Sequence, residues 1–235
     1  MKIATYNING IKARIEALPD WLDEAQPDVA VLQEIKSVDE NFPRELFEER
    51  GYNVETHGQK SFNGVAILSK LPMRDMGDHD FAGLGHARHV AAELENGVTV
   101  QNFYVPAGGD VPDREVNEKF GQKLDYLAEM RDWFRAEAPK KSILVGDLNI
   151  APREDDVWSH KQLLKIVSHT PVETESMARI VTAGRFTDLA RREHDPAQKL
   201  YTWWSYRSKD WAASNRGRRL DHIWANPAAE PLAIP

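Results

Sequence analysis

The stretch ILVGDLNIAP, residues 143–152, places an aspartate and an asparagine directly after a run of β-favouring residues. The three residues at its start predict a short buried strand. Gly146 then lets the chain turn, and Pro152 prevents a regular strand from continuing. The stretch therefore predicts a strand that ends by presenting two small polar side chains, Asp147 and Asn149, at one spot.

Short apolar runs and longer amphipathic stretches alternate along the rest of the chain. The runs predict strands, mostly buried on both faces, at residues 3–6, 29–33, 64–69, 98–105, 142–148 and 219–225. The amphipathic stretches predict helices at residues 15–25, 42–51 and 117–138. The polar stretch 153–185 shows no clear periodicity, and there we expect only loops and short helices. Strands that alternate with helices predict an α/β or layered sandwich fold.

Composition sets the broad class of protein. The chain has 235 residues, of which 41% are hydrophobic and 29% charged, and it contains no cysteine. This length predicts one large domain or two fused halves, and we expect a single domain over residues 1–235. The lack of cysteine excludes disulfides, thiolate zinc sites and cysteine nucleophiles. No run approaches the roughly 18 apolar residues of a membrane span, and the N-terminus carries no long apolar segment. We therefore expect a cytoplasmic protein without a membrane partner.

Charge is unevenly distributed. The formal net charge of −7 argues mildly against indiscriminate binding to nucleic acid, but it does not exclude a local basic surface. Between residues 207 and 219 a single acid, Asp210, faces five cations: Arg207, Lys209, Arg216, Arg218 and Arg219. Such a cluster neutralises backbone phosphates regardless of base sequence, whereas the alternative is a solvated surface loop. Three tryptophans interleave with this segment, and of these we expect Trp204 to lie in the core.

Polar side chains recur where the predicted strands end. They are Asn7 and Asn9, Glu34, Tyr104, and Asp147 and Asn149, while Asp221 lies within the last predicted strand. Taken singly, each is more often a turn, cap or helix-start residue. Strand ends that converge on one edge are, however, where α/β layers build sites, and the recurrence at five strands favours one shared site. Glu34 and Asn7 offer hard oxygen ligands, which suit Mg²⁺ or Mn²⁺.

These residues carry a resemblance to a known family. The segments TYNINGIKAR, PDVAVLQEIK, FYVPAGGD, LVGDLNIAP and RSKDWAASNRGRRLDHI occur in this order, and together they resemble the exonuclease III family of apurinic/apyrimidinic (AP) endonucleases. That family lies within the wider DNase I-like phosphoesterases, and the arginine-rich segment is typical of its DNA-repair branch. The resemblance spans residues 2 to about 224. It implies a four-layer α-β-β-α sandwich of two mostly antiparallel sheets, with pseudo-two-fold related halves.

The resemblance also implies catalytic roles. Glu34 would be the principal metal ligand, and the implied metal set is Glu34, Asn7, Asp147 and Asn149, with Asn9 close by. Asp147 would orient or deprotonate the attacking water. Asn149 would donate from its amide to a phosphate oxygen. Tyr104 would hydrogen-bond the phosphate or assist as a phenolate, and Asp221 would complete the catalytic set.

The same resemblance implies a DNA-binding surface. Its implied residues are Arg88, Trp203, Arg207, Lys209, Arg216, Arg218 and Leu220. Trp203 and Leu220 match the family's apolar pocket for a base-free deoxyribose, which is easily extruded because it has no base to unstack. Arg88 would add a phosphate or metal-site contact, with a strand-end salt bridge as the alternative. The implied partner is double-stranded DNA with abasic sites or 3′ ends, bound by a monomer.

The chain departs from the family pattern twice. Ala107 stands where the family carries an asparagine or glutamine, so that phosphate contact would fall to backbone amides of the two following glycines. The family normally ends with a strand and a serine-aspartate-histidine motif, whereas this chain stops at NPAAEPLAIP before any such motif. His222 directly follows Asp221, but adjacent side chains of a strand point to opposite faces, so it is a poor substitute. We therefore expect a missing last strand and a rate reduced by on the order of 10²–10⁴-fold.

Three functional interpretations follow. The first is a metal-dependent DNA-repair nuclease that cuts 5′ to abasic sites and removes nucleotides or blocking groups from 3′ ends. The second is a phosphodiesterase or phosphatase acting on lipids or small molecules, which the arginine-rich segment disfavours. The third is a catalytically weak or silent DNA-binding form, which the absent histidine motif favours. We favour the first for the natural protein.

Overall fold

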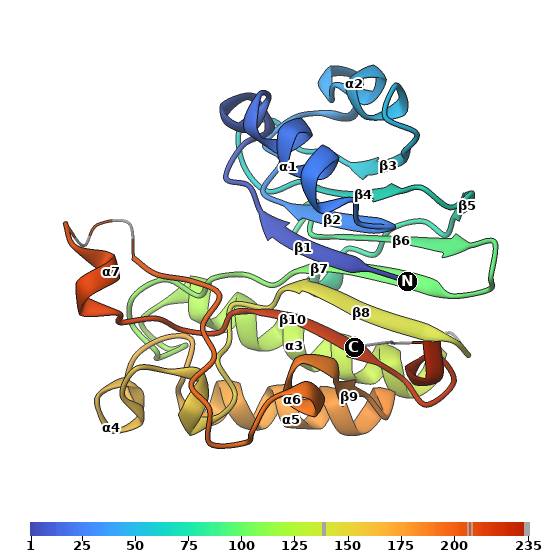
Figure 1. The fold of residues 1–235 in the computed structure, drawn as a ribbon. Coiled ribbons are helices and arrows are strands. Elements are labelled where there is room, and N and C mark those ends of the chain that lie inside the picture. The colour runs from blue at the N-terminus through green and yellow to red at the C-terminus, as the bar shows by residue number, and fades with distance from the viewer. Residues whose placement is uncertain (138–139, 206, 208, 233–235) are drawn as a thin grey trace.

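The computed structural model describes residues 1–137, 140–205, 207 and 209–232. Two sheets lie face to face, and helices cover the outer side of each, which makes four layers (Figure 1). One sheet has the order β1-β2-β4-β3 and the other the order β5-β6-β7-β8-β10-β9. Each contains one parallel pair, β1 with β2 and β7 with β8, and is otherwise antiparallel. The predicted layered α/β class is confirmed.

The elements have the following bounds. The strands are β1 (Ile3–Asn7), β2 (Val29–Gln33), β3 (Asn53–His57), β4 (Val65–Ser69), β5 (Met73–Asp75), β6 (His89–Leu94), β7 (Thr99–Tyr104), β8 (Ser142–Asp147), β9 (Thr187–Asp188) and β10 (Asp221–Ala225). The α-helices are α1 (Ala17–Ala25), α2 (Arg44–Glu48), α3 (Glu118–Glu137), α4 (His160–Leu163), α5 (Pro171–Gly184), α6 (Leu189–Glu193) and α7 (Trp211–Ser214). Short 3₁₀ turns occur at Ile11–Arg14, Asp39–Asn41, Phe81–Gly83, Glu154–Asp156 and Glu230–Leu232.

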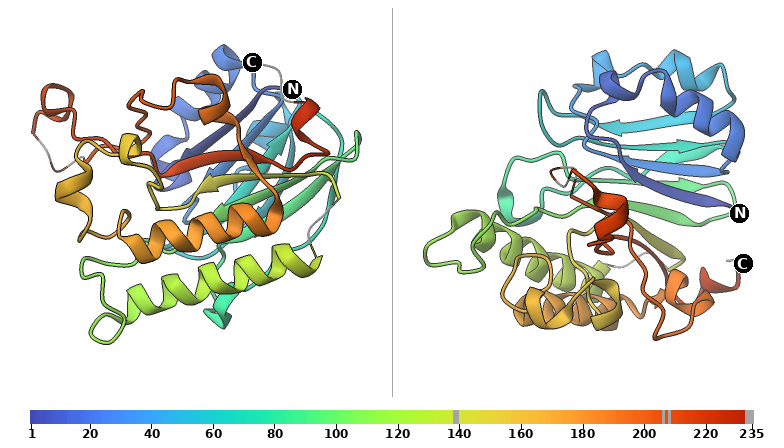
Figure 2. Two further views of the ribbon diagram at one scale, coloured as in Figure 1. Left: turned by 90° about the horizontal axis from the view of Figure 1, so that it is seen from below. Right: turned by 60° about the vertical axis from the view of Figure 1, so that its left-hand side comes forward.

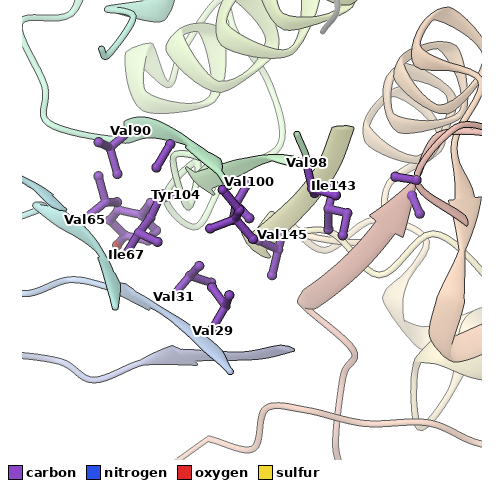
Figure 3. Packing of buried hydrophobic residues seen from close by; sticks show 14 residues of the cluster. Val29, Val31, Val65, Ile67, Val90, Val98, Val100, Tyr104, Ile143 and Val145 are labelled. Carbon is purple, nitrogen blue, oxygen red and sulfur yellow. The ribbon is translucent and has the colours of Figure 1, made fainter. Parts of the chain in front are cut away.

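The space between the sheets is filled by β-branched side chains. Val31 on β2 and Ile67 on β4 face Val100 on β7 and Val145 on β8 in one continuous cluster (Figure 3). All residues of β2, β4, β7 and β8 are buried, because the central strands have a packed layer on both faces. The close-packed side chains between the sheets therefore fix the position of one sheet relative to the other.

Helices close the two outer faces. α1 and α2 cover the first sheet, whereas α3 and α5 lie side by side across the second (Figures 1 and 2). Each outer layer has its own apolar cluster, anchored by Phe47 on the first side and by Phe134 and Ile180 on the second. No helix in the described ranges is long and apolar enough to cross a membrane.

The six predicted strands and three predicted helices are all confirmed. The prediction for residues 153–185 is wrong, because α5 there is a regular helix of 14 residues. Its start is marked in the sequence: Pro171 occupies the first turn, and the Glu173 carboxylate accepts a hydrogen bond from the backbone N–H of Thr170 at 3.1 Å. The sequence did not predict strands β3, β5, β6 and β9 either, because they are short or mixed in polarity.

Candidate active site

The sheet topology brings the polar strand ends together. β1 and β8 both run toward the end of the sandwich at which α7 lies (Figure 1). Asn7 ends β1, and Glu34 follows β2, its parallel neighbour. Tyr104 and Asp147 end the parallel strands β7 and β8 directly opposite each other in register. Asp221 begins β10 and pairs with Asp147 across the antiparallel ladder. Five side chains predicted from strand ends therefore meet in one place.

Backbone conformation re-aims several of these residues. Glu34, Lys36 and Asn149 adopt positive φ angles of 54°, 53° and 52°. Asparagine tolerates this left-handed region, but a glutamate or lysine occupies it at a cost. Strained residues of this kind persist where the surrounding structure over-determines them, and they cluster at functional sites. The strained backbone after β2 is thus an independent indication that Glu34 belongs to a functional site.

Asn7 joins the two sheets through its amide. Its Nδ2 donates to Glu34 Oε1 at 2.9 Å and to Asp147 Oδ2 at 3.0 Å. Tyr104 adds a second cross-sheet bond, because its hydroxyl donates to Glu34 Oε1 at 2.7 Å. Lys36 Nζ forms an ion pair with the other oxygen, Glu34 Oε2, at 3.0 Å. Every oxygen of this carboxylate is therefore oriented by a named donor.

The carboxyl groups differ in their tendency to ionise. Burial alone would raise the pKa of Glu34, but hydrogen bonds from Asn7, Tyr104 and Lys36 outweigh it and the pKa is lowered. Burial raises the pKa of Asp147 to about 6, against the opposing effect of the Asn7 hydrogen bond. Burial and the nearby Asp147 raise the pKa of Asp221 to about 8. At neutral pH, Glu34 and Asp147 are therefore the ionised carboxylates of this cluster, whereas Asp221 is mostly protonated.

Two neutral groups complete the hydrogen bonding. The Thr202 hydroxyl donates to Asp221 Oδ2 at 2.6 Å. Burial and the neighbouring Glu34 raise the pKa of Tyr104, so this side chain stays a phenol in the site as it stands.

Asn149 holds Asp147 through its backbone, whose N–H donates to Asp147 Oδ1 at 3.0 Å. The amide of Asn149 turns instead to Val105, donating to the carbonyl oxygen at 2.9 Å.

A cavity of about 650 Å³ adjoins the acidic cluster. It brings together predicted residues from distant segments: Asn149, Trp203, Arg207, Arg216, Arg218 and Leu220. Ala107 and Gly109 also line it. The guanidinium of Arg216 lies 4.6 Å from the ring centre of Trp158, and that of Arg218 lies 5.6 Å from the ring centre of Trp203. Two pairs of cationic and aromatic side chains thus line the cavity, as in surfaces that bind nucleic acid strands.

Two further predicted DNA contacts, Lys209 and Arg88, lie outside this cavity. Lys209 is exposed and does not line this cavity. Arg88 stacks on the Tyr104 ring at 4.6 Å and donates to the Tyr104 carbonyl oxygen at 3.3 Å. The alternative of a salt bridge for Arg88 is wrong for the part of the chain that the structure describes. Stacking places the Arg88 charge beside the acidic cluster without neutralising any carboxylate.

Two expectations about the basic segment need correction. Arg219 is not part of a solvent-facing basic cluster, because it is buried and pairs with Asp156 at 2.7 Å and Asp188 at 2.7 Å. Trp204 is not in the core; it is half-buried and packs against Trp211, with ring centres 5.7 Å apart. Neither could be seen locally, since the acids that bury Arg219 lie 63 and 31 residues away in the chain.

His222 lies where strand geometry predicts. It is buried, and its Nε2 donates to the carbonyl oxygen of Ile150 at 2.9 Å, on the face opposite to that of Asp221. The expectation that His222 does not partner Asp221 is confirmed. Sequence reasoning missed Lys36, whose signal is its place two residues after Glu34. It also missed Thr202, for which the sequence holds no signal beyond its proximity to Trp203.

The donor set fits a small, hard divalent cation. No group of three or more histidine, aspartate or glutamate side chains within the described ranges is arranged to hold a metal ion. Mg²⁺ is instead bound through one or two carboxylates, with waters and substrate phosphate completing its shell. Glu34 and Asp147, which share the Asn7 amide between them, supply two carboxylates of this kind. The chemistry of the residues therefore fits Mg²⁺ or Mn²⁺.

The fold and this strand-end cluster define a class of phosphoesterase, and comparisons agree. The chain belongs to the endonuclease/exonuclease/phosphatase family, whose sequence model matches residues 4–234. Within it, the chain groups with exonuclease III and the AP endonucleases. It is 35% identical to exodeoxyribonuclease III of Haemophilus influenzae over 239 residues, which cover 95% of this chain and 86% of that protein.

Solved structures give the same relationship. An AP endonuclease from Archaeoglobus fulgidus superposes with a TM-score of 0.90 at 32% identity, covering 98% of this chain and 88% of that one. The 3′ phosphatase NExo from Neisseria, bound to a product DNA hairpin, superposes with a TM-score of 0.87 at 31% identity, covering 97% and 87%. The predicted family and four-layer fold are therefore confirmed, and the chain is related to nucleases of DNA repair.

Proposed function

We propose that this chain is a divalent-metal-dependent DNA-repair nuclease that hydrolyses phosphodiesters 5′ to abasic sites and removes nucleotides or blocking groups from 3′ ends. One observation carries the proposal: the acidic cluster of Glu34, Asp147 and Asp221 adjoins a cavity lined by Trp203, Arg218 and other cationic and aromatic side chains. Relatives named exodeoxyribonuclease III, AP endonuclease and 3′ phosphatase support it.

The residues have complementary roles in this proposal. Glu34, Asn7, Asp147 and Asn149 would hold Mg²⁺ or Mn²⁺, which when bound neutralises charge on the phosphate and the leaving oxygen. Asp147, with a pKa raised to about 6, is a carboxylate at neutral pH. Its pKa is close enough to 7 for the carboxylate to accept a proton from water. Tyr104 donates from its phenol to Glu34 Oε1. Asp221 is hydrogen-bonded to Thr202 beside it.

Substrate choice would come from the cavity. Arg207, Arg216 and Arg218 present positive charge to the DNA backbone, with Lys209 and Arg88 adding charge outside that wall. Trp203 and Leu220 give the cavity an apolar patch that accepts a sugar without a base. We expect a monomer to bind duplex DNA in this way, and the cytoplasmic location stays a prediction.

The test uses a 5′-labelled duplex with one abasic-site analogue, incubated with Mg²⁺, Mn²⁺ or EDTA and resolved on a gel. We expect incision 5′ to the analogue that requires the metal and is lost in Asp147→Asn, while DNA affinity is retained. Asp132→Asn is the matched control, because that aspartate lies on the exposed face of α3. Salt-sensitive binding without incision would identify a silent DNA-binding form instead. Hydrolysis of small phosphodiesters with no benefit from duplex DNA would identify a different phosphoesterase.

A further inference from the structure

Three consecutive carbonyl groups directly after the catalytic strand are each held by a buried side chain. The bonds are Lys123 Nζ to the Asn149 oxygen at 2.8 Å, His222 Nε2 to the Ile150 oxygen at 2.9 Å, and His169 Nδ1 to the Ala151 oxygen at 2.6 Å. We call Lys123, His169 and His222 the carbonyl clamp. Its members come from α3, from the loop before α5 and from β10, so three separate parts of the chain converge on three consecutive residues.

The segment needs such partners because it has left the sheet. Residues 148–151 follow β8 and are largely buried, so their peptide groups have neither strand neighbours nor water. Two backbone bonds help, from Leu148 N to the Leu220 oxygen at 2.9 Å and from Ala151 N to the Ser168 oxygen at 2.8 Å. The carbonyl groups depend on side chains, which makes the clamp the main constraint on the direction of these peptide planes.

The clamp holds a single protonation pattern. A carbonyl oxygen only accepts, so His222 must carry its proton on Nε2 and His169 on Nδ1. The other ring nitrogen of His169 lies 2.8 Å from His160 Nδ1, which completes its hydrogen bonding. Burial lowers the pKa of His222 to about 4 and also lowers the pKa of His169, so both rings are neutral at neutral pH. The two donors therefore stay in place without added charge.

Lys123 extends the clamp to a second loop. Its ammonium group is fully buried, forms an ion pair with Glu173 at 2.6 Å, and also donates to the Ala107 oxygen at 3.3 Å. Glu173 in turn accepts from the backbone N–H groups of Ser168 and Thr170 at 2.9 and 3.1 Å. One cation thus fastens the loop after β7 and the segment after β8 to the start of α5. These two loops follow Tyr104 and Asp147.

We propose that the carbonyl clamp positions the catalytic segment from Asp147 to Ala151 for the chemical step, which makes Lys123, His169 and His222 positioning residues. The clamp holds the carbonyl oxygen of Asn149, and the N–H of the same residue donates to Asp147 Oδ1 at 3.0 Å. It also holds Asn149 on the wall of the cavity. This inference rests on the proposed function for its catalytic consequence, but the ordering of the segment does not depend on activity.

Two variants of each histidine distinguish loss of the hydrogen-bond donor from loss of the imidazole ring. His222→Leu removes the donor, whereas His222→Gln keeps an N–H near the position of Nε2. His169→Leu and His169→Asn form the equivalent pair for Nδ1. Tyr52→Phe is the matched control, because it removes another buried donor, the hydroxyl that bonds the Pro27 oxygen at 2.9 Å in the outer layer of the first sheet.

Two measurements are made on each variant at the same interval below its own unfolding midpoint. Amide hydrogen exchange of the peptide covering residues 148–152 reports order in the segment, independent of activity. Steady-state kcat and KM on abasic duplex at saturating Mg²⁺ report its catalytic consequence. We expect the leucine variants to speed exchange about tenfold and to lower kcat about 10- to 100-fold, with KM within roughly threefold of wild type. The glutamine and asparagine variants should recover most of both losses, and Tyr52→Phe should change neither.

The outcomes separate this inference from the proposed function. Exchange and kcat that stay at wild-type values in both leucine variants would overturn the clamp, as would equal defects in His222→Gln and His222→Leu. If wild type cleaves no abasic DNA, the proposed function is wrong, and the exchange measurement alone then decides whether the clamp orders the segment.

Discussion

Replacing Asp156 by asparagine should destabilise the protein far more than the same change one residue earlier. Asp156 is fully buried between two guanidinium groups, accepting from Arg219 Nε at 2.7 Å and Nη2 at 3.1 Å and also from Arg191. Removing one member of a buried ion pair typically costs about 3–5 kcal/mol, because the partner charge is left uncompensated. Asp188 still contacts Arg219 at 2.7 Å, but it accepts only from the backbone N–H of Arg191, at 3.1 Å, which does not replace the bond that Asp156 makes to the Arg191 guanidinium.

The neighbouring Asp155 is the internal control. It meets Lys199 at 3.6 Å and is partly exposed, so Asp155→Asn should cost less than about 1 kcal/mol. For a chain of this length, the Asp156→Asn cost corresponds to a midpoint lowered by roughly 6–20 °C. Thermal and urea unfolding at pH 7 measure both variants. A cost for Asp156→Asn below 1 kcal/mol, or equal to that of Asp155→Asn, would refute the reasoning.

The difference should also depend on pH in one direction. Burial alone would raise the pKa of Asp156, but the hydrogen bonds and charges of Arg219 and Arg191 outweigh it and hold the pKa below its usual value. A carboxyl group with a lowered folded-state pKa contributes stability that is complete above its unfolded pKa and is lost as the pH falls further. The gap between wild type and Asp156→Asn should therefore be constant between pH 5 and 8 and narrow below pH 4.

Three other perturbations have defined outcomes. Burial lowers the folded-state pKa of both His89 and His222 to about 4, so at pH 5 each histidine is protonated in the unfolded chain but not in the folded one. Each should therefore lower the free energy of unfolding by about 2 kcal/mol at pH 5 relative to pH 7.5. Urea unfolding at the two pH values should show that loss reduced in His89→Gln; an unchanged loss would contradict it. Tyr104→Phe removes the hydroxyl that orients the carboxylate after β2 and should lower kcat about 10²-fold with DNA affinity retained, as measured by kinetics and fluorescence anisotropy. Arg216→Ala should reduce the slope of log affinity against log salt by about one, whereas Arg179→Ala on the outer face of α5 should not change it.

Local sequence signals predicted the framework of the fold because its central strands are buried on both faces. Continuous apolar runs such as those of β2 and β8 need no knowledge of their neighbours to be recognised. α5 was missed because much of its surface is polar and its start depends on a capping pattern rather than on periodicity. Elements whose own residues form a clear apolar pattern could therefore be predicted from the sequence.

The site was predictable only as far as strand ends. Glu34, Asp147 and Asp221 could be placed near one another because parallel and antiparallel pairing fixes which ends meet. The bond from Asn7 to Asp147 joins residues 140 positions apart, and the burial of Arg219 depends on acids in other segments. Long-range pairing of this kind changes the role of a residue without leaving a local mark.

The division of the site between the sheets has a mechanical consequence. The first sheet supplies Glu34, whereas the second supplies Asp147 and the cavity wall that contains Arg218. The side chains of Asn7 and Tyr104 bridge the two sheets at the site, and buried Asn102 on β7 bonds to β2 and β4 behind them. The interlocked valine layer resists sliding of one sheet over the other. A substrate held by the second sheet would thus meet the Glu34 carboxylate at a separation fixed by core packing. Since Asn149 both lines the cavity and donates its N–H to Asp147 Oδ1, the fit of a bound strand and the orientation of the Asp147 carboxylate depend on the same residue.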